Sequence, residues 1–542
     1  MKFKRFAAVA ALLSLSFAAS AQAPATGFTP ERFRAHVAFL ADDLLEGREA
    51  GTRGYDIAAR YVATRFEALG LTPANGGSWY QQVPFVRFAM IAPAQISVGD
   101  RTFVHGRDLM FRQSPEAGRL DFEAPAVFAG YGIHAPELGF DDYRGLDVRG
   151  RVVVLLGGVP QGLPSDLAAH LANEKVRTAA RRGAAGVILL RGAEEAQRRP
   201  YEQMPRRETP PGITWVDPAG VPYVDARGLR FLATADTPFA EALFEDAPRS
   251  LAGVRAEAAR PGVQPRGFTL APTLRIERES ANSAMTSPNV VAVLPGTDPA
   301  VADEYVLLMA HLDGVGIAPG GEGDRIRNGA MDNASGVATL LEVAWQMALP
   351  RNRPRRPLLF AAVTAEEKGL LGAQYLARHP VVDGRVVGVV NLDMPVLTYD
   401  FSDVIAFGAE HSTLGPIVRR AAARMNVALA PDPMPEQRLF TRSDHYMFVR
   451  EGVPSVFLMT GFAGEGERAF RHFLATHYHA PTDDLTLPFD WRAAARFAEL
   501  NYLIAREIAD APEPPRWYQD SFFGNAFAPE AQKAPRPASG GG

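Results

Sequence analysis

Five side chains of types that commonly bind metal ions are spread over the C-terminal half of the chain, each at or just past the end of a predicted strand. They are His311, Asp332, Glu367, Asp393 and His479. Such a spread suits a site for two cations, because no single loop can surround both ions. This set of nitrogen and oxygen ligands suits zinc, with manganese or cobalt as alternatives, and excludes a closed structural zinc site, which would need thiolates. Glu366, beside Glu367, is a further carboxylate that is available as a base.

The first candidate ligand, His311, lies in the sequence His311-Leu312-Asp313 directly after a predicted strand over 305–310. Residues two apart in an extended segment point the same way, so Asp313 is expected to reach the His311 ring or its surroundings. A carboxylate in that place would fix the tautomer of the ring and raise its basicity. The alternative is a histidine at a strand end that is bonded to a carbonyl group.

The second candidate, Asp332, stands just before an amphipathic helix predicted over 334–347. An aspartate in this position is more often a helix cap than a metal ligand. Here Asn333 or Ser335 could cap the helix instead and leave Asp332 free. The two oxygens of a carboxylate can bridge two cations, whereas an imidazole ring cannot.

Glu366 and Glu367 follow an apolar strand predicted over 358–364. Two adjacent carboxylates at the end of a buried strand are costly unless they are exposed or paired with cations. Neighbouring side chains point in different directions, so one can bind metal while the other faces a water molecule. The alternative is a solvated turn in which Lys368 is the partner.

Asp393 and His479 complete the set. Asp393 follows an apolar strand over 386–392, and ligands of open α/β sheets gather outside the carboxyl ends of strands, although a loop cap is the alternative. His479 precedes a turn stiffened by Pro481. His472 and His477 compete for its role, and the spacing from the proline favours His479.

The elements that must position these side chains form an alternating pattern after residue 288. Strands are predicted over 289–294, 305–310, 358–364, 386–392, 404–407 and 455–459. Helices are predicted over 334–347, 370–378, 413–425 and 491–508, with two more near the N-terminus, one from Pro30 and one over 54–69. Apolar strands that alternate with helices predict an α/β fold with a mostly parallel central sheet flanked by helices.

The chain is expected to divide into several parts, because its 542 residues exceed one ordinary core. Residues 28–90 and 286–510 form a discontinuous domain that holds the candidate ligands, and 91–285 form an inserted β-rich α/β domain. The segment 528–542, rich in Pro, Ala and Gly, is predicted to be disordered.

Residues 1–21 have the composition of a secretory signal peptide. Three basic residues precede an apolar stretch over 6–17, and Ala19-Ser20-Ala21 forms a cleavage site. Cleavage after Ala23 would leave Pro24 next to the cut, so cleavage after Ala21 is favoured. The alternative is an uncleaved membrane anchor, for which the apolar stretch is short.

Composition limits the function classes. Hydrophobic residues make up 47% and charged residues 22% of the chain, as in soluble globular proteins. The net charge of −4 becomes −7 when the three basic residues of the signal are removed, which argues against a nucleic-acid partner. With no cysteine, the chain has neither disulfides nor a thiol nucleophile.

The motifs H-L-D, M-D-N-A-S-G, E-E-K-G, N-L-D-M and Y-H-A-P-T-D resemble, in order and spacing, the M28 family of zinc aminopeptidases. The N-terminal pattern L-x-G-R-E-A-G-T-x-G is similar to the same family. Within the insert, F-A-G-Y-G-I, G-R-V-V-V-L and K-x-x-x-A-x-x-x-G-A-A-G-V-I-L-L resemble the protease-associated (PA) domain that is often inserted in such enzymes.

The resemblance implies that Asp332 bridges two zinc ions. One ion would be held by His311 and Asp393 and the other by Glu367 and His479. It further implies that Glu366 is the general base, that Asp313 supports His311, and that Tyr478 could donate a hydrogen bond to the oxyanion. The segment Ser443-Asp444-His445 matches a further family segment near the site, and its role stays open.

The expected function is that of an exported dinuclear zinc metallopeptidase, an aminopeptidase that acts on peptides through an activated water and a glutamate base. A carboxypeptidase or dipeptidase on the same scaffold is an alternative, with Arg442 as the cation for a substrate carboxylate. A glutaminyl cyclase with one metal and a non-catalytic binding protein are further alternatives. The signal, without disulfides, suggests a bacterial periplasmic or secreted protein, and neither the oligomeric state nor the preferred substrate residue follows from the sequence.

Overall fold

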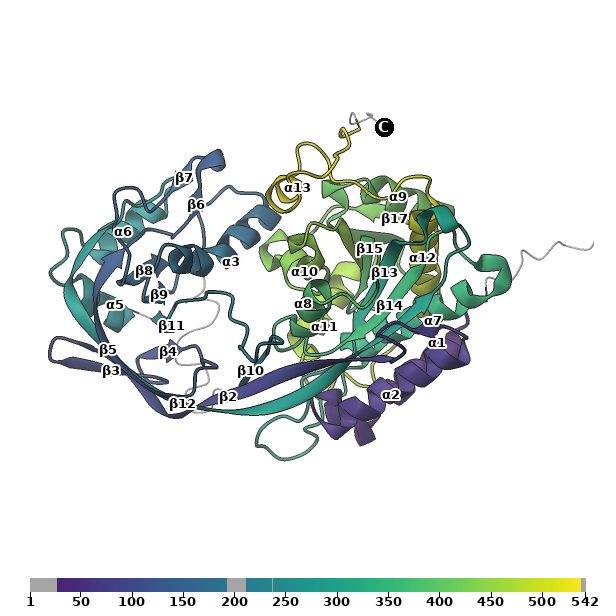
Figure 1. The fold of residues 1–542 in the computed structure, drawn as a ribbon, viewed down its shortest axis with the longest axis horizontal. Coiled ribbons are helices and arrows are strands. Elements are labelled where there is room, and N and C mark those ends of the chain that lie inside the picture. The colour runs from purple at the N-terminus through teal and green to yellow at the C-terminus, as the bar shows by residue number, and fades with distance from the viewer. Residues whose placement is uncertain (1–26, 193–210, 236, 538–542) are drawn as a thin grey trace, which may run out of the picture.

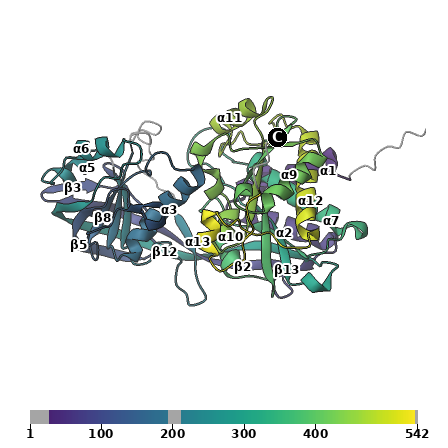
Figure 2. The same ribbon diagram turned by 90° about the horizontal axis from the view of Figure 1, so that it is seen from above.

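The computed structural model describes residues 27–192, 211–235 and 237–537, which form two lobes. The main lobe (residues 27–90 and 286–537) holds most of the helices, and the insert lobe (residues 91–285) lies beside it (Figures 1 and 2). Two long strands connect them: β2 (Tyr80–Val98) and β12 (Phe268–Leu294) pair antiparallel from Tyr80 opposite Val290 to Val98 opposite Leu274. The predicted signal peptide lies outside the described residues. Within those residues, no helix has the length and apolar character needed to cross a membrane.

The main lobe contains a mostly parallel sheet in the order β17-β16-β18-β15-β13-β14-β12. Its strands after β12 are β13 (Glu304–His311), β14 (Leu358–Val363), β15 (Arg385–Leu392), β16 (Asp403–Phe407), β17 (Ala428–Ala430) and β18 (Ser455–Thr460). Strand β13 pairs in parallel with both β14 and β15, and β15 pairs in parallel with β18. Strands β12 and β16 join antiparallel. The predicted α/β fold is confirmed.

Helices cover this sheet. On one side α7 (Ser335–Ala348) and α12 (Trp491–Asp510) pack against β13 and β15, and α1 (Pro30–Leu40) packs against these two helices. The others are α2 (Arg53–Ala68), α8 (Leu371–Arg378), α9 (Leu414–Arg424), α10 (His445–Arg450), α11 (Gly466–Thr476) and α13 (Phe522–Phe527). The sequence pattern predicted α7, α8, α9 and α12 within three residues at each end but did not indicate α10 and α11.

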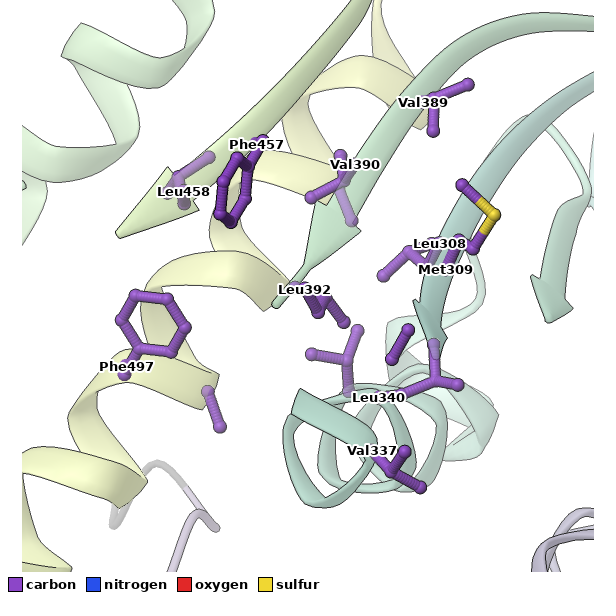
Figure 3. Close-up of a cluster of buried hydrophobic side chains, with 14 of the residues drawn as sticks. Leu308, Met309, Val337, Leu340, Val389, Val390, Leu392, Phe457, Leu458 and Phe497 are labelled. Atoms are coloured by element: carbon purple, nitrogen blue, oxygen red, sulfur yellow. The ribbon is translucent and has the colours of Figure 1, made fainter. Parts of the chain in front are cut away.

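The core of the main lobe lies between the sheet and these helices. Figure 3 shows Leu308 of β13 and Leu392 of β15 near Leu340 of α7. These side chains are at most 3% exposed. Burying one apolar side chain of this size stabilises a fold by roughly 1.5–3 kcal/mol. The packed core therefore holds the carboxyl ends of the strands at fixed places, and the candidate ligands follow these ends.

The insert lobe has its own hydrophobic core, which shares no residue with the core of the main lobe among those described. Its strands are β3 (Arg101–Val104), β4 (Leu109–Phe111), β5 (Gly118–Phe128), β8 (Val152–Leu156), β9 (Gly186–Leu190), β10 (Gly212–Trp215) and β11 (Phe231–Ala235). Its helices are α3 (Ser165–Arg181), α5 (Thr237–Phe244) and α6 (Leu251–Ala258). Strands β2 and β12 continue through positions 91 and 285 without a break, so secondary structure marks no domain boundary there. The assignment to PA domains stays a prediction.

The end of the chain differs from the predicted disorder over 528–542. Residues 528–537 lie against the main lobe: the N–H of Gln519 donates to the Ala534 carbonyl, and Arg536 pairs with Asp520 at 2.7 Å. The Arg536 guanidinium also lies over the Tyr518 ring. Specific polar contacts thus hold a segment whose composition alone suggested disorder. The last five residues are outside the described part.

The two lobes contact each other through α3. His170 of α3 shares a hydrogen bond of 2.7 Å with the Tyr446 hydroxyl of α10, and its ring lies against phenylalanines of α13. Burial lowers the pKa of His170 to about 4. The ring is therefore neutral at neutral pH and supports the contact between the lobes.

Stability is expected to fall below pH 6.5 because of His170. The unfolded chain binds this proton near pH 6.5 and the folded protein only near pH 4, so the stabilisation is full above pH 6.5 and lost towards pH 4. The slope for one such group is about 1.4 kcal/mol per pH unit at most. Thermal unfolding between pH 4.5 and 7 should show a steeper decline in the wild type than in His170→Gln. Parallel curves would contradict the prediction.

Candidate metal centre

Three of the predicted ligands converge at the carboxyl ends of β13 and β15. His311 is the last residue of β13, and Asp393 comes directly after β15. The Nε2 atom of His311 lies 3.1 Å from Asp393 Oδ1 and 3.3 Å from Asp332 Oδ1. All three residues are buried. These three ligand atoms form one compact cluster that could hold a metal ion.

A second cluster shares Asp332. The Nε2 atom of His479 lies 3.2 Å from Asp332 Oδ2 and 3.0 Å from Glu367 Oε2. The two oxygens of Asp332 therefore face two different histidines. The structure brings together all five predicted ligands, in two groups of three that meet at Asp332.

The positions of two ligands differ from the predicted pattern. His479 follows helix α11 and not a strand, and its backbone has a φ of 57°. Asp332 precedes α7, at the end of a long loop after β13. The competing His477 bonds to Thr482 and belongs to neither cluster. Lys368, the alternative partner of the two glutamates, pairs with Glu49 at 2.7 Å.

The loops that carry the ligands contain backbone conformations that are unfavourable for L residues. Ala365, just before Glu366, and Met394, just after Asp393, have φ values of 56° and 39°. Each such residue costs on the order of 1 kcal/mol or more and persists only where surrounding contacts enforce it. Such conformations concentrate at functional sites.

Asn333 supplies several of those contacts. Its Oδ1 atom accepts hydrogen bonds from the N–H groups of Gly336 at 3.0 Å and Met394 at 3.1 Å. Its Nδ2 atom donates to the Leu392 carbonyl at 2.9 Å. Asn333 thus caps the start of α7, as one of the two predicted alternatives, and ties Asp332 to the end of β15.

Asp313 has a different contact from the predicted one. The His311 ring is hydrogen-bonded to the main-chain carbonyl of Asp313 at 3.1 Å, whereas the Asp313 carboxylate is 3.9 Å away. That carboxylate accepts hydrogen bonds from the N–H groups of Glu366 at 3.0 Å and Glu367 at 3.3 Å. The side chain of Asp313 therefore holds the glutamate pair in place, and its carbonyl orients the histidine.

Ser443 is a supporting residue whose role the sequence left open. Its hydroxyl donates to Asp393 Oδ2 at 2.6 Å and accepts from Asn391 Nδ2 at 2.6 Å. Its neighbour Asp444 is fully buried, and burial raises the pKa of Asp444 well above the usual range. Burial lowers the pKa of His445 to about 3, so that ring stays neutral.

Arg48 and Asp483 support the loop before Asp332. The Asp483 carboxylate accepts from the N–H groups of Met331 at 2.8 Å and Asp332 at 3.0 Å. The buried Arg48 donates to the carbonyls of Leu312 and Gly329, each at 3.0 Å. Both residues lie in the motifs G-R-E and A-P-T-D, but their contacts join segments far apart in the chain.

The electrostatics of the donor set fit divalent cations. Burial raises the pKa of Glu366 well above its usual value, and the carboxylates of Asp393 and Glu367 raise it further. Although burial opposes it, the hydrogen bonds that the His479 ring donates to Asp332 and Glu367 raise the pKa of His479 to about 10. Among the described residues, Glu367 Oε1 is buried without a hydrogen-bond partner. The cluster has more negative than positive groups, and bound cations would offset this excess.

Glu366 and Tyr478 line the pocket beside these clusters. The pocket has a volume of about 50 Å³, and His311, Asp332 and Asp393 also line it. Glu366 belongs to neither group of three ligands. Burial raises the pKa of the Tyr478 hydroxyl, and Asp332 contributes to the effect, so this group stays protonated and can donate a hydrogen bond.

Comparison with known proteins gives a family match over the main lobe: residues 289–505 match the model of peptidase family M28. Over 108 residues the chain is 41% identical to a probable zinc metalloprotease of Pyrenophora teres f. teres (strain 0-1), which covers 19% of this chain and 22% of that protein. Over 251 residues it is 26% identical to leupeptin-inactivating enzyme 1 of Streptomyces exfoliatus, covering 43% and 51%. The chain thus spans about half or less of the length of these curated relatives.

A solved structure shows the same fold over nearly the whole chain. The aminopeptidase from Aneurinibacillus sp. strain AM-1 aligns with a TM-score of 0.51 and 20% identity, covering 90% of this chain and 95% of that one. At this identity the likeness concerns the fold.

Proposed function

We propose that the chain is a zinc-dependent aminopeptidase that binds two zinc ions and removes the first residue of peptides, because residues 289–505 match the model of peptidase family M28. The observation that carries the proposal is the position of Asp332, whose two carboxylate oxygens face His311 and His479 in separate clusters. A carboxylate between two groups of nitrogen and oxygen ligands suits a bridge between two cations. The names of the relatives support zinc as the metal.

In this proposal each ion would take three ligands from the chain, and both ions would share Asp332. His311 and Asp393 would complete one site, and Glu367 and His479 would complete the other. When bound, zinc would lower the pKa of water and polarise the scissile carbonyl group. Proton transfer and stabilisation of the oxyanion are carried out by side chains that line the pocket.

Glu366 is the general base of the proposed reaction. Its carboxylate accepts the proton of the attacking water and delivers a proton to the leaving amine. The Asp313 carboxylate holds the main chain of Glu366, so the base keeps a fixed position beside both clusters. Tyr478 donates a hydrogen bond to the oxyanion that forms when the carbonyl is attacked.

The test uses a panel of aminoacyl-p-nitroanilides with and without a chelator. The zinc-loaded protein should release p-nitroaniline, and the chelator should abolish this release. A free amino acid should appear from an unblocked peptide but not from its N-acetylated form. Hydrolysis from the C-terminus would favour the carboxypeptidase alternative, and cyclisation of N-terminal glutamine without hydrolysis would favour the cyclase.

We further propose that the chain is exported from a bacterial cell. The basic residues, apolar stretch and Ala19-Ser20-Ala21 site of residues 1–21 support this proposal. N-terminal sequencing of the protein from a periplasmic extract should give Gln22 as the first residue. An intact Met1 in that extract would contradict cleavage.

Replacing Ser443 with alanine is expected to weaken the His311–Asp393 metal site. The hydroxyl donates to Asp393 at 2.6 Å, and the loss of such a supporting contact typically lowers metal affinity by about 10–100-fold. Competition with a chromogenic chelator would measure the affinity. Ser455→Ala is the control, because this buried serine donates to the Val453 carbonyl in another loop. Equal affinities in both variants would contradict the role of Ser443.

A further inference from the structure

We propose that Arg442 is a specificity-determining residue, which selects substrates that carry a carboxylate close to the bond to be cleaved. This inference rests on the proposed aminopeptidase function and adds a substrate class to it. Arg442 lines the same pocket as Glu366 and Tyr478. It is the one lysine or arginine among the described residues that line this pocket.

The lining of the pocket combines different kinds of side chain. The candidate ligands His311, Asp332 and Asp393 line it together with four apolar side chains and Arg442. These apolar residues are Met394, Leu439, Phe457 and Met459. A substrate group that enters this pocket therefore meets candidate metal ligands, apolar side chains and one guanidinium. Such a surface fits an alkyl segment that ends in a negative charge.

The charge of Arg442 is available for a ligand. Within the described part of the chain, the Arg442 side chain donates one hydrogen bond, from Nη1 to the Gln437 carbonyl at 3.4 Å. No carboxylate of the described residues forms an ion pair with it. Its side chain is exposed to solvent. A guanidinium can bind a carboxylate through two parallel hydrogen bonds, which makes it well suited to recognise this group.

The main chain of Arg442 has a fixed position relative to the metal centre. Arg442 directly precedes Ser443, whose hydroxyl holds Asp393 at 2.6 Å. The N–H of Arg442 donates to the Leu439 carbonyl at 3.0 Å, which closes the turn around another residue of the pocket wall. The guanidinium thus extends from a main-chain segment whose position is fixed by the contact between Ser443 and the candidate ligand Asp393.

Two kinds of substrate could present the carboxylate. One is a peptide whose first residue is glutamate or aspartate, and the other is a dipeptide whose C-terminal carboxylate lies one residue past the cleaved bond. Both present a carboxylate to the Arg442 guanidinium. Pairs of substrates that differ only in that charge distinguish the two sources.

The experiment measures kcat/KM of the zinc-loaded full chain for two substrate pairs. The pairs are glutamyl- and glutaminyl-p-nitroanilide, and Leu-Gly and its C-terminal amide. The wild type should prefer the charged member of at least one pair by about tenfold, and the pair that responds identifies the source of the carboxylate. Higher salt should reduce this preference, because it screens exposed charges.

Variants at position 442 connect the preference to the side chain. Arg442→Met keeps an apolar stem without the charge and should reduce the preference about tenfold, to near one. Arg442→Lys keeps the charge but not the paired hydrogen bonds, so it should retain part of the preference. Arg438→Met removes an equal charge from the same loop outside the pocket lining, and should leave the preference as in the wild type.

Two results would overturn the inference in distinguishable ways. Equal kcat/KM within both pairs, or a preference that persists in Arg442→Met, overturns the role of Arg442 while hydrolysis of leucyl-p-nitroanilide still supports the aminopeptidase. If the zinc-loaded wild type hydrolyses neither leucyl-p-nitroanilide nor any member of the pairs, the proposed function fails, and the inference fails with it.

Discussion

Replacing Glu366 with glutamine is expected to lower kcat by about 10²–10⁴-fold, the usual contribution of a positioned general base. Glu366 lines the pocket but belongs to neither group of metal ligands. A glutamine side chain has nearly the same shape, and the N–H that Asp313 holds is unchanged. The amide cannot accept the proton of the attacking water, so the chemical step should be slow while binding persists.

The measurement combines turnover of an aminoacyl-p-nitroanilide with elemental analysis. Glu366→Gln should contain as much zinc as the wild type, because its ligands are intact. Glu451→Gln is a matched control, since this glutamate pairs with Arg378 away from the pocket and should keep full activity. Wild-type turnover in Glu366→Gln would remove Glu366 from the role of base.

Replacing Asp332 with asparagine is expected to lower metal occupancy at both positions. Oδ1 of Asp332 lies 3.3 Å from His311 Nε2 and Oδ2 lies 3.2 Å from His479 Nε2, so one side chain serves both clusters. The amide removes the negative charge and replaces one ligand oxygen with an NH₂ group that cannot bind a cation. Activity should therefore fall together with zinc content.

The comparison with Asp393→Asn makes this test specific. Asp393 belongs to the His311 cluster alone, so its amide variant should lose metal mainly from one position and keep close to one zinc per chain after dialysis. After the same dialysis, Asp332→Asn should keep less zinc per chain than Asp393→Asn. Because bound ligand stabilises the folded state, a chelator should also lower the melting temperature less in Asp332→Asn than in the wild type. Two zinc ions in dialysed Asp332→Asn would contradict the bridge.

The supporting residues show where sequence patterns stop being informative. The H-x-D motif correctly placed Asp313 near His311, but the carboxylate bonds to the N–H groups of Glu366 and Glu367, 53 and 54 residues later. The hydroxyl of Ser443 meets Asp393 across 50 residues. The partners in these hydrogen bonds depend on where the side chains of Asp313, Ser443 and Asp393 point in the folded protein. The spacing of residues within one motif does not predict these directions.

The short helices and the chain end were also hard to predict. Helix α10 has six residues, too few for a periodic pattern to be recognised, and it is held by burial of Tyr446, Phe448 and Val449. The segment after α13 has the composition of a disordered tail, but Arg536 and the main chain of Ala534 bond to the main lobe. In both cases contacts with distant residues override the local preference.

Residue types and their order along the chain were sufficient to predict the α/β fold and to select five side chains that the structure brings together. Apolar strands that alternate with helices can be buried in few ways, and the ligands follow the ends of those strands or flank the helices. The pairing of the ligands into two groups and the free charge of Arg442 beside them depend on the tertiary structure. They are set by how β13, β15, α7 and the His479 loop pack against one another, because distances of about 3 Å between residues up to 147 positions apart exist only after the core has formed.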